Sequence, residues 1–405
     1  MSLLTAAPAP TSIFARIGRL AAEHGAVNLG QGFPDFAPDA ALTDRLAHHV
    51  SHSSNQYAPL PGVPRLTRAI AAKIERCHGV RPDAAAEITV TSGATQAIWT
   101  AIQSVISPGD EAIVFEPAYD SYVPAVGSRG GIPIPLPLKP GDGFRPDWSG
   151  FAERLTERTR LVVLNNPHNP TGTCWRDGDL RELERLVAGR DLAVLSDEVY
   201  EHLVYDGREH LSALRYPGLR ERAFVTCSFG KTFHVTGWKV GYVVAPPALT
   251  RRFRGVHQFT VFTVNTPAQH AIADHLADAS SYESLPAFFA AKRDLLAGEL
   301  AGARLRVLPS GGSYFCLADY SAVSDERDID FAERLIREHG VATIPVSPFY
   351  SDAPAGIDAA ADYDGAHGAH GADGADGGEA RRLVRLCFAK RPATLRAAAE
   401  RLARV

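Results

Sequence analysis

ITVTSGATQAIWTAIQSVI, residues 88–106, is the stretch that decides the fold class. Its first part, ITVTS, is a short apolar run rich in β-branched residues, which predicts a buried strand. Its second part, ATQAIWTAIQSVI, has apolar residues at helical spacing. A strand followed directly by a helix is the unit from which parallel sheets covered by helices are built.

The same alternation continues through the middle of the chain. A helical pattern covers residues 177–189, and further apolar runs predict strands at EAIVFEP (111–117), RLVVLNNP (160–167), LAVLSDE (192–198), RAFVTCSF (222–229) and GYVVAP (241–246). The sequence therefore predicts an α/β fold with a parallel or mostly parallel sheet covered on both faces. Ligands of such sheets bind at the carboxyl ends of the strands.

The length of 405 residues predicts two domains, because single cores stop growing at about 250–300 residues. We expect an N-terminal arm and part of a small domain in residues 1–45, and a large domain in residues 46–274. Residues 275–405 are predicted to form a smaller α+β domain, with helices at 285–303 and 328–339 and strands in SYFCLADY (313–320) and RRLVRLCFAK (381–390).

Residues 351–380 are rich in Asp, Gly, Ala and His, a composition that cannot bury a core. We expect a mobile low-complexity insert there. A metal site at His367 and His370 is the less favoured interpretation, because no ordered set of ligands surrounds them, and no metal is predicted.

Composition excludes several classes of function. The net charge of −4 gives no basic surface for nucleic acid, and no apolar run is long enough to span a membrane. The N-terminus lacks the charged and apolar regions of a signal peptide. The five cysteines are scattered and never form CxxC, which argues against a disulfide scaffold or a zinc site and predicts a cytoplasmic protein.

The GKT at residues 230–232 is a false match to a phosphate-binding P-loop. That loop needs glycine at position 225, where this chain has Val225. GxGxxG does not occur either, so the sequence gives a nucleotide-dependent enzyme no support.

Polar and aromatic side chains follow the predicted strands one after another. In chain order they are Ser92-Gly93-Ala94-Thr95, Tyr119, Asn169, Asp197 with Tyr200, and Ser228 with Lys231. Each has a structural alternative on its own: Asn169 as a turn residue, Asp197 as a helix cap, Tyr119 as core packing, Lys231 as a solvated lysine. Together they converge on one edge of one sheet, which favours a shared ligand.

Pyridoxal phosphate (PLP) is the cofactor that uses this set. It needs a lysine for a Schiff base, an acid for the ring nitrogen, donors for the phenolate oxygen, a ring to stack on and a phosphate pocket. Small residues at a helix start let backbone N–H groups reach the phosphate. The lysine must be neutral to attack a carbonyl, so its pKa must be lowered by burial or by neighbouring charge.

At these residues the chain resembles a known family, the fold-type I PLP-dependent aminotransferases of class I/II, over residues 13–405. The resemblance lies in NPHNPTG (166–172), SDEVYEHLVYDG (196–207), SFGKTFHVTGWKVGY (228–242) and RLCFAK (385–390). Within the family it most resembles bacterial methionine aminotransferases and the kynurenine aminotransferase/glutamine transaminase group, through NLGQGFPDF (28–36), NQYAPLPGVPRL (55–66) and VHQFTVFTVNTPAQ (256–269). It implies a seven-stranded, mostly parallel sheet in the large domain.

The resemblance also implies roles for residues. Lys231 would form the Schiff base and move the proton, and Asp197 would pair with the pyridinium nitrogen. Tyr200 and Asn169 would donate to the phenolate oxygen, Tyr119 would stack on the ring, and the phosphate would be held by Gly93, Ala94, Thr95, Ser228 and Lys239. Tyr57 would reach the phosphate from a partner subunit, which implies a homodimer with shared active sites.

For the substrate, the resemblance implies that Arg385 clamps the α-carboxylate with help from the Gly32 backbone and Asn169. The alternative is that Arg385 faces solvent like its neighbours Arg381 and Arg382. An apolar pocket would be lined by Phe33, Tyr122 and Phe262, and apolar pockets discriminate weakly between substrates.

The expected activity is a ping-pong transfer of the amino group of methionine, or of another apolar or aromatic amino acid, to a 2-oxo acid. The alternatives are a kynurenine/glutamine transaminase with cysteine-S-conjugate β-lyase activity and, more remotely, a PLP-binding regulator without turnover.

Overall fold

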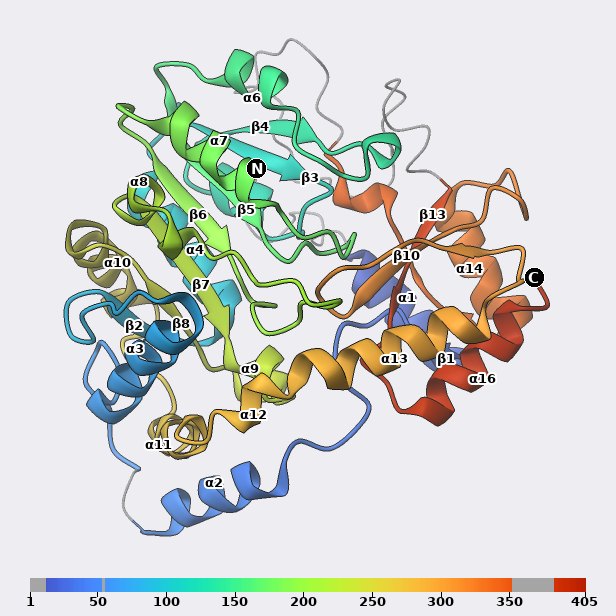
Figure 1. Ribbon diagram of the computed structural model, residues 1–405, viewed down its shortest axis with the longest axis horizontal. Helices are drawn as coiled ribbons and strands as arrows, with labels where there is room; N and C mark the ends of the chain where they lie inside the picture. Colours follow the sequence, from blue (N-terminus) through green and yellow to red (C-terminus); the bar gives the residue numbers. More distant parts are fainter. Residues whose placement is uncertain (1–11, 53–54, 352–381) are drawn as a thin grey trace, which may run out of the picture.

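The computed structural model describes residues 12–52, 55–351 and 382–405, and its centre is a seven-stranded sheet (Figure 1). Only β8 is antiparallel to its neighbours, β2 and β7, and the remaining pairs are parallel. The predicted α/β class with a mostly parallel sheet is confirmed. In spatial order the strands are β2 (Ile88–Thr91), β8 (Gly241–Val244), β7 (Ala223–Ser228), β6 (Ala193–Asp197), β5 (Thr159–Asn165), β3 (Glu111–Glu116) and β4 (Ile132–Pro137).

Alternate side chains of the strands enter two separate apolar layers, as the pleat of a sheet requires. On β3, Ala112 and Val114 pack into one layer, while Ile113 and Phe115 pack into the other. The first layer is closed by α4 (Gly93–Val105), α5 (Tyr122–Gly127) and α10 (Pro247–Thr260), and the second by α3 (Pro64–His78), α6 (Trp148–Arg154) and α7 (Asp177–Val187). Helices therefore cover both faces of the sheet, which explains the near-continuous apolar runs.

β4 is the strand that the apolar runs did not reveal. Its sequence, IPIPLP, contains prolines that cannot donate to a ladder. It pairs only with β3 and forms one edge of the sheet, where proline is tolerated.

A second, smaller sheet lies beside the first. It has the order β12 (Ile344–Pro345), β13 (Leu383–Cys387), β10 (Phe315–Asp319) and β9 (Arg306–Val307), and every pair in it is antiparallel. It is accompanied by α13 (Leu285–Glu299), α14 (Asp328–His339) and α16 (Pro392–Leu402). In Figure 1, α13 runs from the side of the large sheet to that of the small one.

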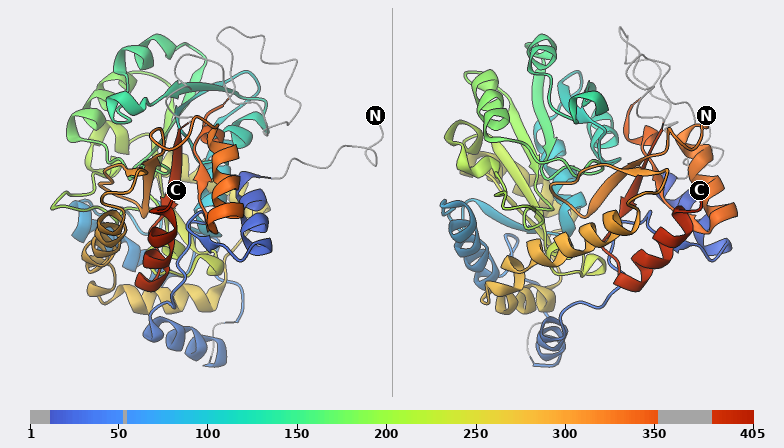
Figure 2. Two further views of the ribbon diagram at one scale, coloured as in Figure 1. Left: turned by 90° about the vertical axis from the view of Figure 1, so that its right-hand side faces the viewer. Right: turned by 45° about the vertical axis from the view of Figure 1, so that its right-hand side comes forward.

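The beginning of the chain joins this smaller layer. β1 (Val27–Asn28) pairs in parallel with β11 (Val341–Ala342), and α1 (Ile13–Glu23) packs against α14. Figure 2 shows the first and last described segments together on one side of the molecule. α2 (Ala40–His52) instead packs on α11 (Thr266–Leu276), and the short helices are α8 (Pro217–Arg220), α9 (Phe229–Thr232) and α12 (Ser280–Glu283).

Three sequence predictions fall outside the described residues. They are the mobile insert, of which only residue 351 is described, the metal interpretation of His367 and His370, and the solvent-facing position of Arg381. Within residues 12–52, 55–351 and 382–405, no three His, Cys, Asp or Glu side chains are grouped to hold a metal ion. In the same part of the chain, no helix has the length and apolar character needed to cross a membrane.

Candidate active site

Three neighbouring parallel strands end in polar residues at the same edge of the large sheet. Asn165 ends β5, Asp197 ends β6 and Ser228 ends β7. Asn165 lies opposite Asp197 in the ladder, and its side-chain amide donates to the Asp197 carbonyl at 2.8 Å. The carboxyl edge of the sheet is therefore where the predicted side chains come together.

The Asp197 carboxylate is buried and held by two donors. The Tyr122 hydroxyl donates to its Oδ2 at 2.5 Å, and the Val199 N–H donates to its Oδ1 at 3.3 Å. Burial raises the pKa of Asp197 to about 6, although the Tyr122 hydrogen bond acts in the opposite direction. The carboxylate is thus ionised at neutral pH and can pair with a protonated ring nitrogen.

Lys231 lies on α9, directly after β7. Its backbone N–H donates to the Ser228 hydroxyl, which caps the short helix. Its Nζ donates to the Tyr314 hydroxyl at 2.8 Å and to the Gly32 carbonyl at 3.0 Å. Burial lowers the pKa of the amine to about 8, so the neutral, nucleophilic form is accessible near neutral pH.

Arg385 is a buried arginine in the middle of β13, with 1% of its surface exposed. Its Nη1 donates to the Asn169 side-chain oxygen at 2.7 Å and its Nη2 to the Gly30 carbonyl at 2.8 Å. The guanidinium lies 3.9 Å from the centre of the Phe315 ring. The solvent-facing alternative is wrong for Arg385 but holds for Arg382, which is exposed and pairs with Asp325 at 2.8 Å.

One donor of Arg385 is left without a partner. Its buried Nε has no hydrogen-bond acceptor among the residues that the structure describes. Buried donors are normally satisfied, so a guanidinium edge with an open donor suits a ligand carboxylate.

The start of α4 forms a tight backbone turn beside Lys239. Gly93 has φ +74°, and a Cβ placed on it would lie 3.4 Å from the Lys239 Nζ. A Cβ on Gly241 would lie 3.1 Å from the Ala94 nitrogen and 2.6 Å from the Cys227 carbonyl. The absence of side chains at both glycines keeps the helix start, strand β8 and the Lys239 cation together, which suits a phosphate.

Two predicted tyrosines, Tyr119 and Tyr200, differ in their surroundings. Tyr119 shares a side-chain hydrogen bond with Thr95, and burial raises its pKa. Tyr200 is 3% exposed, and its ring lies 5.1 Å from that of Tyr314 and 5.8 Å from the Lys231 Nζ. Burial raises the pKa of Tyr200, so its hydroxyl stays protonated and can donate.

Five predicted residues lie at exposed positions of this chain: Thr95, Lys239 and three aromatic residues. Phe33 is 44% exposed, Phe262 is 42% exposed and Tyr57 is 83% exposed. The rings of Tyr57 and Phe262 meet edge to face at 5.6 Å. Tyr122, predicted for the substrate pocket, is buried, and its hydroxyl donates to Asp197.

This set of residues fits PLP. A lysine with a lowered pKa, a buried carboxylate for the ring nitrogen, tyrosine and asparagine donors, and a glycine-lined helix start with a cation are the groups that this cofactor requires. Sequence reasoning missed Tyr314 and Asn165. Tyr314 directly precedes β10, the neighbour of the Arg385 strand, and this adjacency was the available signal.

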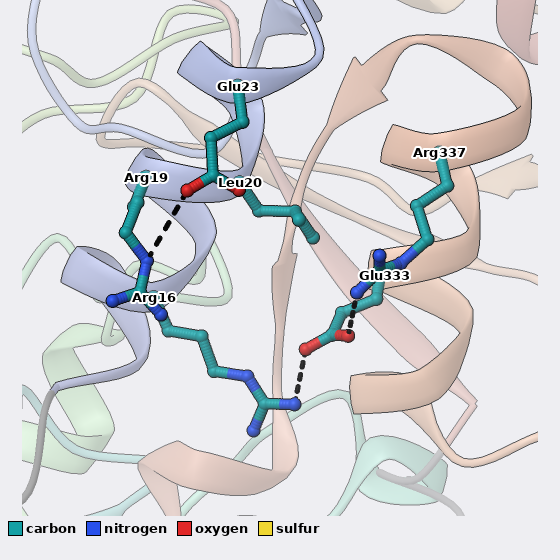
Figure 3. Close-up of a pocket in the computed structure, with 6 residues that line it drawn as sticks. All are labelled: Arg16, Arg19, Leu20, Glu23, Glu333 and Arg337. Carbon is teal, nitrogen blue, oxygen red and sulfur yellow. Dashed lines mark hydrogen bonds and ion pairs between the residues drawn. The ribbon is translucent and has the colours of Figure 1, made fainter.

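A surface hollow of about 360 Å³ between α1 and α14 is not a competing site (Figure 3). Its arginines are paired with carboxylates inside it, with Glu333 accepting from both Arg16 and Arg337, and Arg19 lying 3.8 Å from Glu23. Paired charges leave no free cation for a phosphate or a carboxylate.

The whole chain is similar to proteins of known activity. The family model for aminotransferase class I and II matches residues 25–402. Methionine aminotransferase from Escherichia coli K12 is 49% identical over 97% of this chain and 95% of its own. Kynurenine–oxoglutarate transaminase 1 from Rattus norvegicus is 35% identical over 96% of this chain and 95% of its own. The crystal structure of the E. coli protein YbdL, described as having a methionine aminotransferase function, superimposes with a TM-score of 0.89 at 48% identity, covering 98% of this chain and 97% of that one.

Proposed function

Because this chain belongs to the class I and II aminotransferase family, which is PLP-dependent, we propose that it transfers the amino group of methionine to a 2-oxo acid, using PLP held by Lys231. Other apolar and aromatic amino acids serve as further donors. The reaction is ping-pong: the donor leaves as its 2-oxo acid before the acceptor binds. With methionine the first product is 4-methylthio-2-oxobutanoate.

The observation that carries the chemistry is the position of the part-buried Lys231 amine in one cluster with the buried Asp197 and Arg385. The lysine has a pKa of about 8, the carboxylate is ionised at neutral pH, and the guanidinium keeps a donor that has no partner in the described part of the chain. These are an amine that can hold or move a proton, a partner for a ring nitrogen and a clamp for an α-carboxylate. The donor is inferred from the 49% identity to methionine aminotransferase.

When bound, PLP supplies an electron-withdrawing ring that acidifies the Cα–H bond of the amino acid. Asp197 would keep the ring nitrogen protonated, and Lys231 would take the proton from Cα and deliver it to C4′ of the cofactor. Tyr200 and Asn169 would donate to the phenolate oxygen, and Tyr119 would stack on the ring. The phosphate would be held by Gly93, Ala94, Thr95, Ser228 and Lys239.

Arg385 orients the amino acid by pairing with its α-carboxylate, assisted by Asn169 and the backbone at Gly32. Phe33, Tyr122 and Phe262 form the apolar side of the pocket. A methylene in such a pocket changes the free energy of binding by only about 1–3 kcal/mol. We therefore expect the enzyme to accept all of Met, Phe, Leu, Gln and kynurenine as amino donors.

We also propose that the enzyme is a homodimer with shared sites, in which Tyr57 contacts the phosphate bound by the other subunit. The 83% exposure of Tyr57 and the exposure of its neighbour Phe262 support this, since two adjacent aromatic rings on the surface of one chain suit an interface. A cytoplasmic location is supported by the five cysteines, all of them free.

A kynurenine/glutamine transaminase with β-lyase activity is the second candidate, favoured by the 35% identity to the rat kynurenine transaminase. Steady-state kcat/KM values for Met, Phe, Gln and kynurenine with one common 2-oxo acid separate the two. The proposal expects methionine to rank first. A kynurenine or glutamine preference, together with ammonia and pyruvate release from an S-substituted cysteine, would replace it by the second candidate.

A further inference from the structure

The amine of Lys231 shares a closed triangle of hydrogen bonds with the Tyr314 hydroxyl, which has no role in the proposed chemistry so far, and with the Gly32 carbonyl. Its Nζ donates to the Tyr314 hydroxyl at 2.8 Å and to the Gly32 carbonyl at 3.0 Å. The Tyr314 hydroxyl in turn donates to the same Gly32 carbonyl at 2.5 Å. Both acceptors of the catalytic amine are therefore linked to each other.

Tyr314 is held rigidly in this position. It is 0% exposed, and its ring packs edge to face on Phe315 at 4.9 Å and on Tyr200 at 5.1 Å. Its backbone carbonyl accepts from the Phe388 N–H at 3.0 Å, which ties it to the segment that follows Arg385. The hydroxyl consequently has little freedom to turn away from the amine.

Gly32 is also fixed, because its backbone lies directly on β10. A Cβ at Gly32 would come within 2.7 Å of the Phe315 ring, so a side chain would push this segment away. Two residues earlier, the Gly30 carbonyl accepts from Arg385. One short segment thus presents one carbonyl to the carboxylate clamp and another to the catalytic amine.

A neutral amine has two N–H bonds and one lone pair. When both N–H bonds are given to fixed acceptors, the only orientation left for the lone pair is the third tetrahedral direction. Proton transfer is efficient only from a base that is oriented toward the proton it takes. Lys231 sits at the end of a flexible side chain, so its orientation must come from its neighbours.

We propose that Tyr314 is a positioning residue, whose hydroxyl, with the Gly32 carbonyl, holds the two N–H bonds of Lys231 and aims its lone pair during proton transfer. This rests on the proposed aminotransferase function. The alternative is that the Tyr314 hydroxyl only satisfies the Gly32 carbonyl. That structural role would leave the titration and the proton-transfer step of Lys231 unchanged.

The test compares Tyr314→Phe with Tyr320→Phe, which removes a buried hydroxyl from the far end of the same strand, where it donates to the Glu326 carbonyl at 2.8 Å. In Tyr314→Phe the Gly32 carbonyl keeps Lys231 as a donor, while the hydrogen bond that Tyr314 shares with Tyr200 is lost together with the one to Lys231. The first readout is the pH dependence of Lys231 acetylation by trace acetic anhydride in PLP-free protein, followed by mass spectrometry.

Loss of one acceptor disfavours the ammonium form, so Tyr314→Phe should lower the apparent pKa of Lys231 by about one pH unit, the equivalent of one hydrogen bond. The second readout is a single turnover of PLP-loaded enzyme with methionine and with α-deuterated methionine. The rate should fall by at least about tenfold and the isotope effect should rise, while Tyr320→Phe behaves as wild type.

Wild-type titration together with a wild-type isotope effect in Tyr314→Phe would overturn the proposal. If Tyr314→Phe does not fold, Tyr314→3-fluorotyrosine keeps the packing and weakens the oxygen as an acceptor. This variant should also lower the apparent pKa of Lys231, as Tyr314→Phe does. An unchanged titration of Lys231 would again overturn the proposal. A wild-type enzyme without any half-reaction would refute the proposed function, whereas the labelling experiment would still report on Tyr314.

Discussion

The Tyr122 hydroxyl lies 2.5 Å from the Asp197 carboxylate, and both side chains are buried. The hydrogen bond favours the charged form of Asp197, which burial disfavours. Tyr122 therefore helps to keep Asp197 ionised, as its proposed pairing with the cofactor requires.

Tyr122→Phe should raise the pKa of Asp197 above its value of about 6, because the hydrogen bond to the charged form is lost. PLP affinity should fall as pH decreases through this pKa, and the fall should begin at higher pH in the variant. PLP titrations of the apoprotein between pH 5 and 8 measure it. Tyr216→Phe is the matched control, since it removes a tyrosine–aspartate hydrogen bond of 2.9 Å to Asp177 elsewhere. Superimposable pH profiles for Tyr122→Phe and wild type would contradict this role.

Arg385→Lys should raise KM for the amino acid and lower kcat/KM by at least about 30-fold, corresponding to about 2 kcal/mol, because an ammonium cannot replace a buried planar fork. Arg382→Lys, in the same segment but exposed, should leave both constants unchanged. Steady-state kinetics with methionine measure both variants. Equal losses in the two variants would mean that Arg385 acts through the stability of β13 rather than by clamping the carboxylate.

Sequence patterns predicted the helix-covered sheet because its strands are buried on both faces and read as continuous apolar runs. They missed β4, since alternating prolines weaken every strand signal and only the edge position makes them tolerable. They also did not show that β8 runs antiparallel, because an apolar run such as GYVV carries no direction.

Among the site residues, those that directly follow a strand were predictable because parallel strands end at one edge. Asp197 and Lys231 are examples. The Tyr122 contact with Asp197 and the Tyr314 contact with Lys231 were not predictable, because each joins residues separated by many elements. Exposure of Arg385 could not be decided from alternation in β13 either, as both faces of that strand are buried.

A buried ion pair behind the site should be important for stability. Lys73 pairs with Glu201, the residue after Tyr200, and the Tyr242 hydroxyl lies 2.8 Å from the lysine and 3.0 Å from the carboxylate. Burial alone would raise the pKa of Glu201, but the positive charge of Lys73 lowers this pKa well below its usual range. Lys73→Met leaves the buried Glu201 carboxylate without its cation and should lower the free energy of unfolding by about 3–5 kcal/mol.

Urea unfolding at a fixed PLP concentration measures the effect of Lys73→Met. The double variant with Glu201→Gln should recover most of the loss, because no buried charge is left unpaired. Arg76→Met, which breaks an exposed pair with Glu283, is the control and should change stability far less. A wild-type unfolding curve for Lys73→Met would contradict the account of this pair.

The shared-site dimer predicts complementation between defective subunits. Lys231→Ala lacks the catalytic amine, and Tyr57→Ala should need more PLP for activity. In a mixed dimer, the site that keeps Lys231 would receive an intact Tyr57 from the other subunit. Mixing the two variants, with exchange of subunits, should therefore restore activity at limiting PLP. Activity equal to the average of the two separate variants would show that the sites are not shared.

The central claim is that Lys231 performs aminotransfer from methionine, and an absorbance experiment without any 2-oxo acid tests it most directly. Wild-type protein loaded with PLP should show the band of lysine-linked cofactor, lose it on addition of L-methionine in favour of the pyridoxamine form, and release one 2-oxo acid per site. Lys231→Ala should not complete this conversion at a comparable rate. A wild-type band that methionine leaves unchanged, or a Lys231→Ala protein that converts methionine as fast as wild type, would contradict the claim.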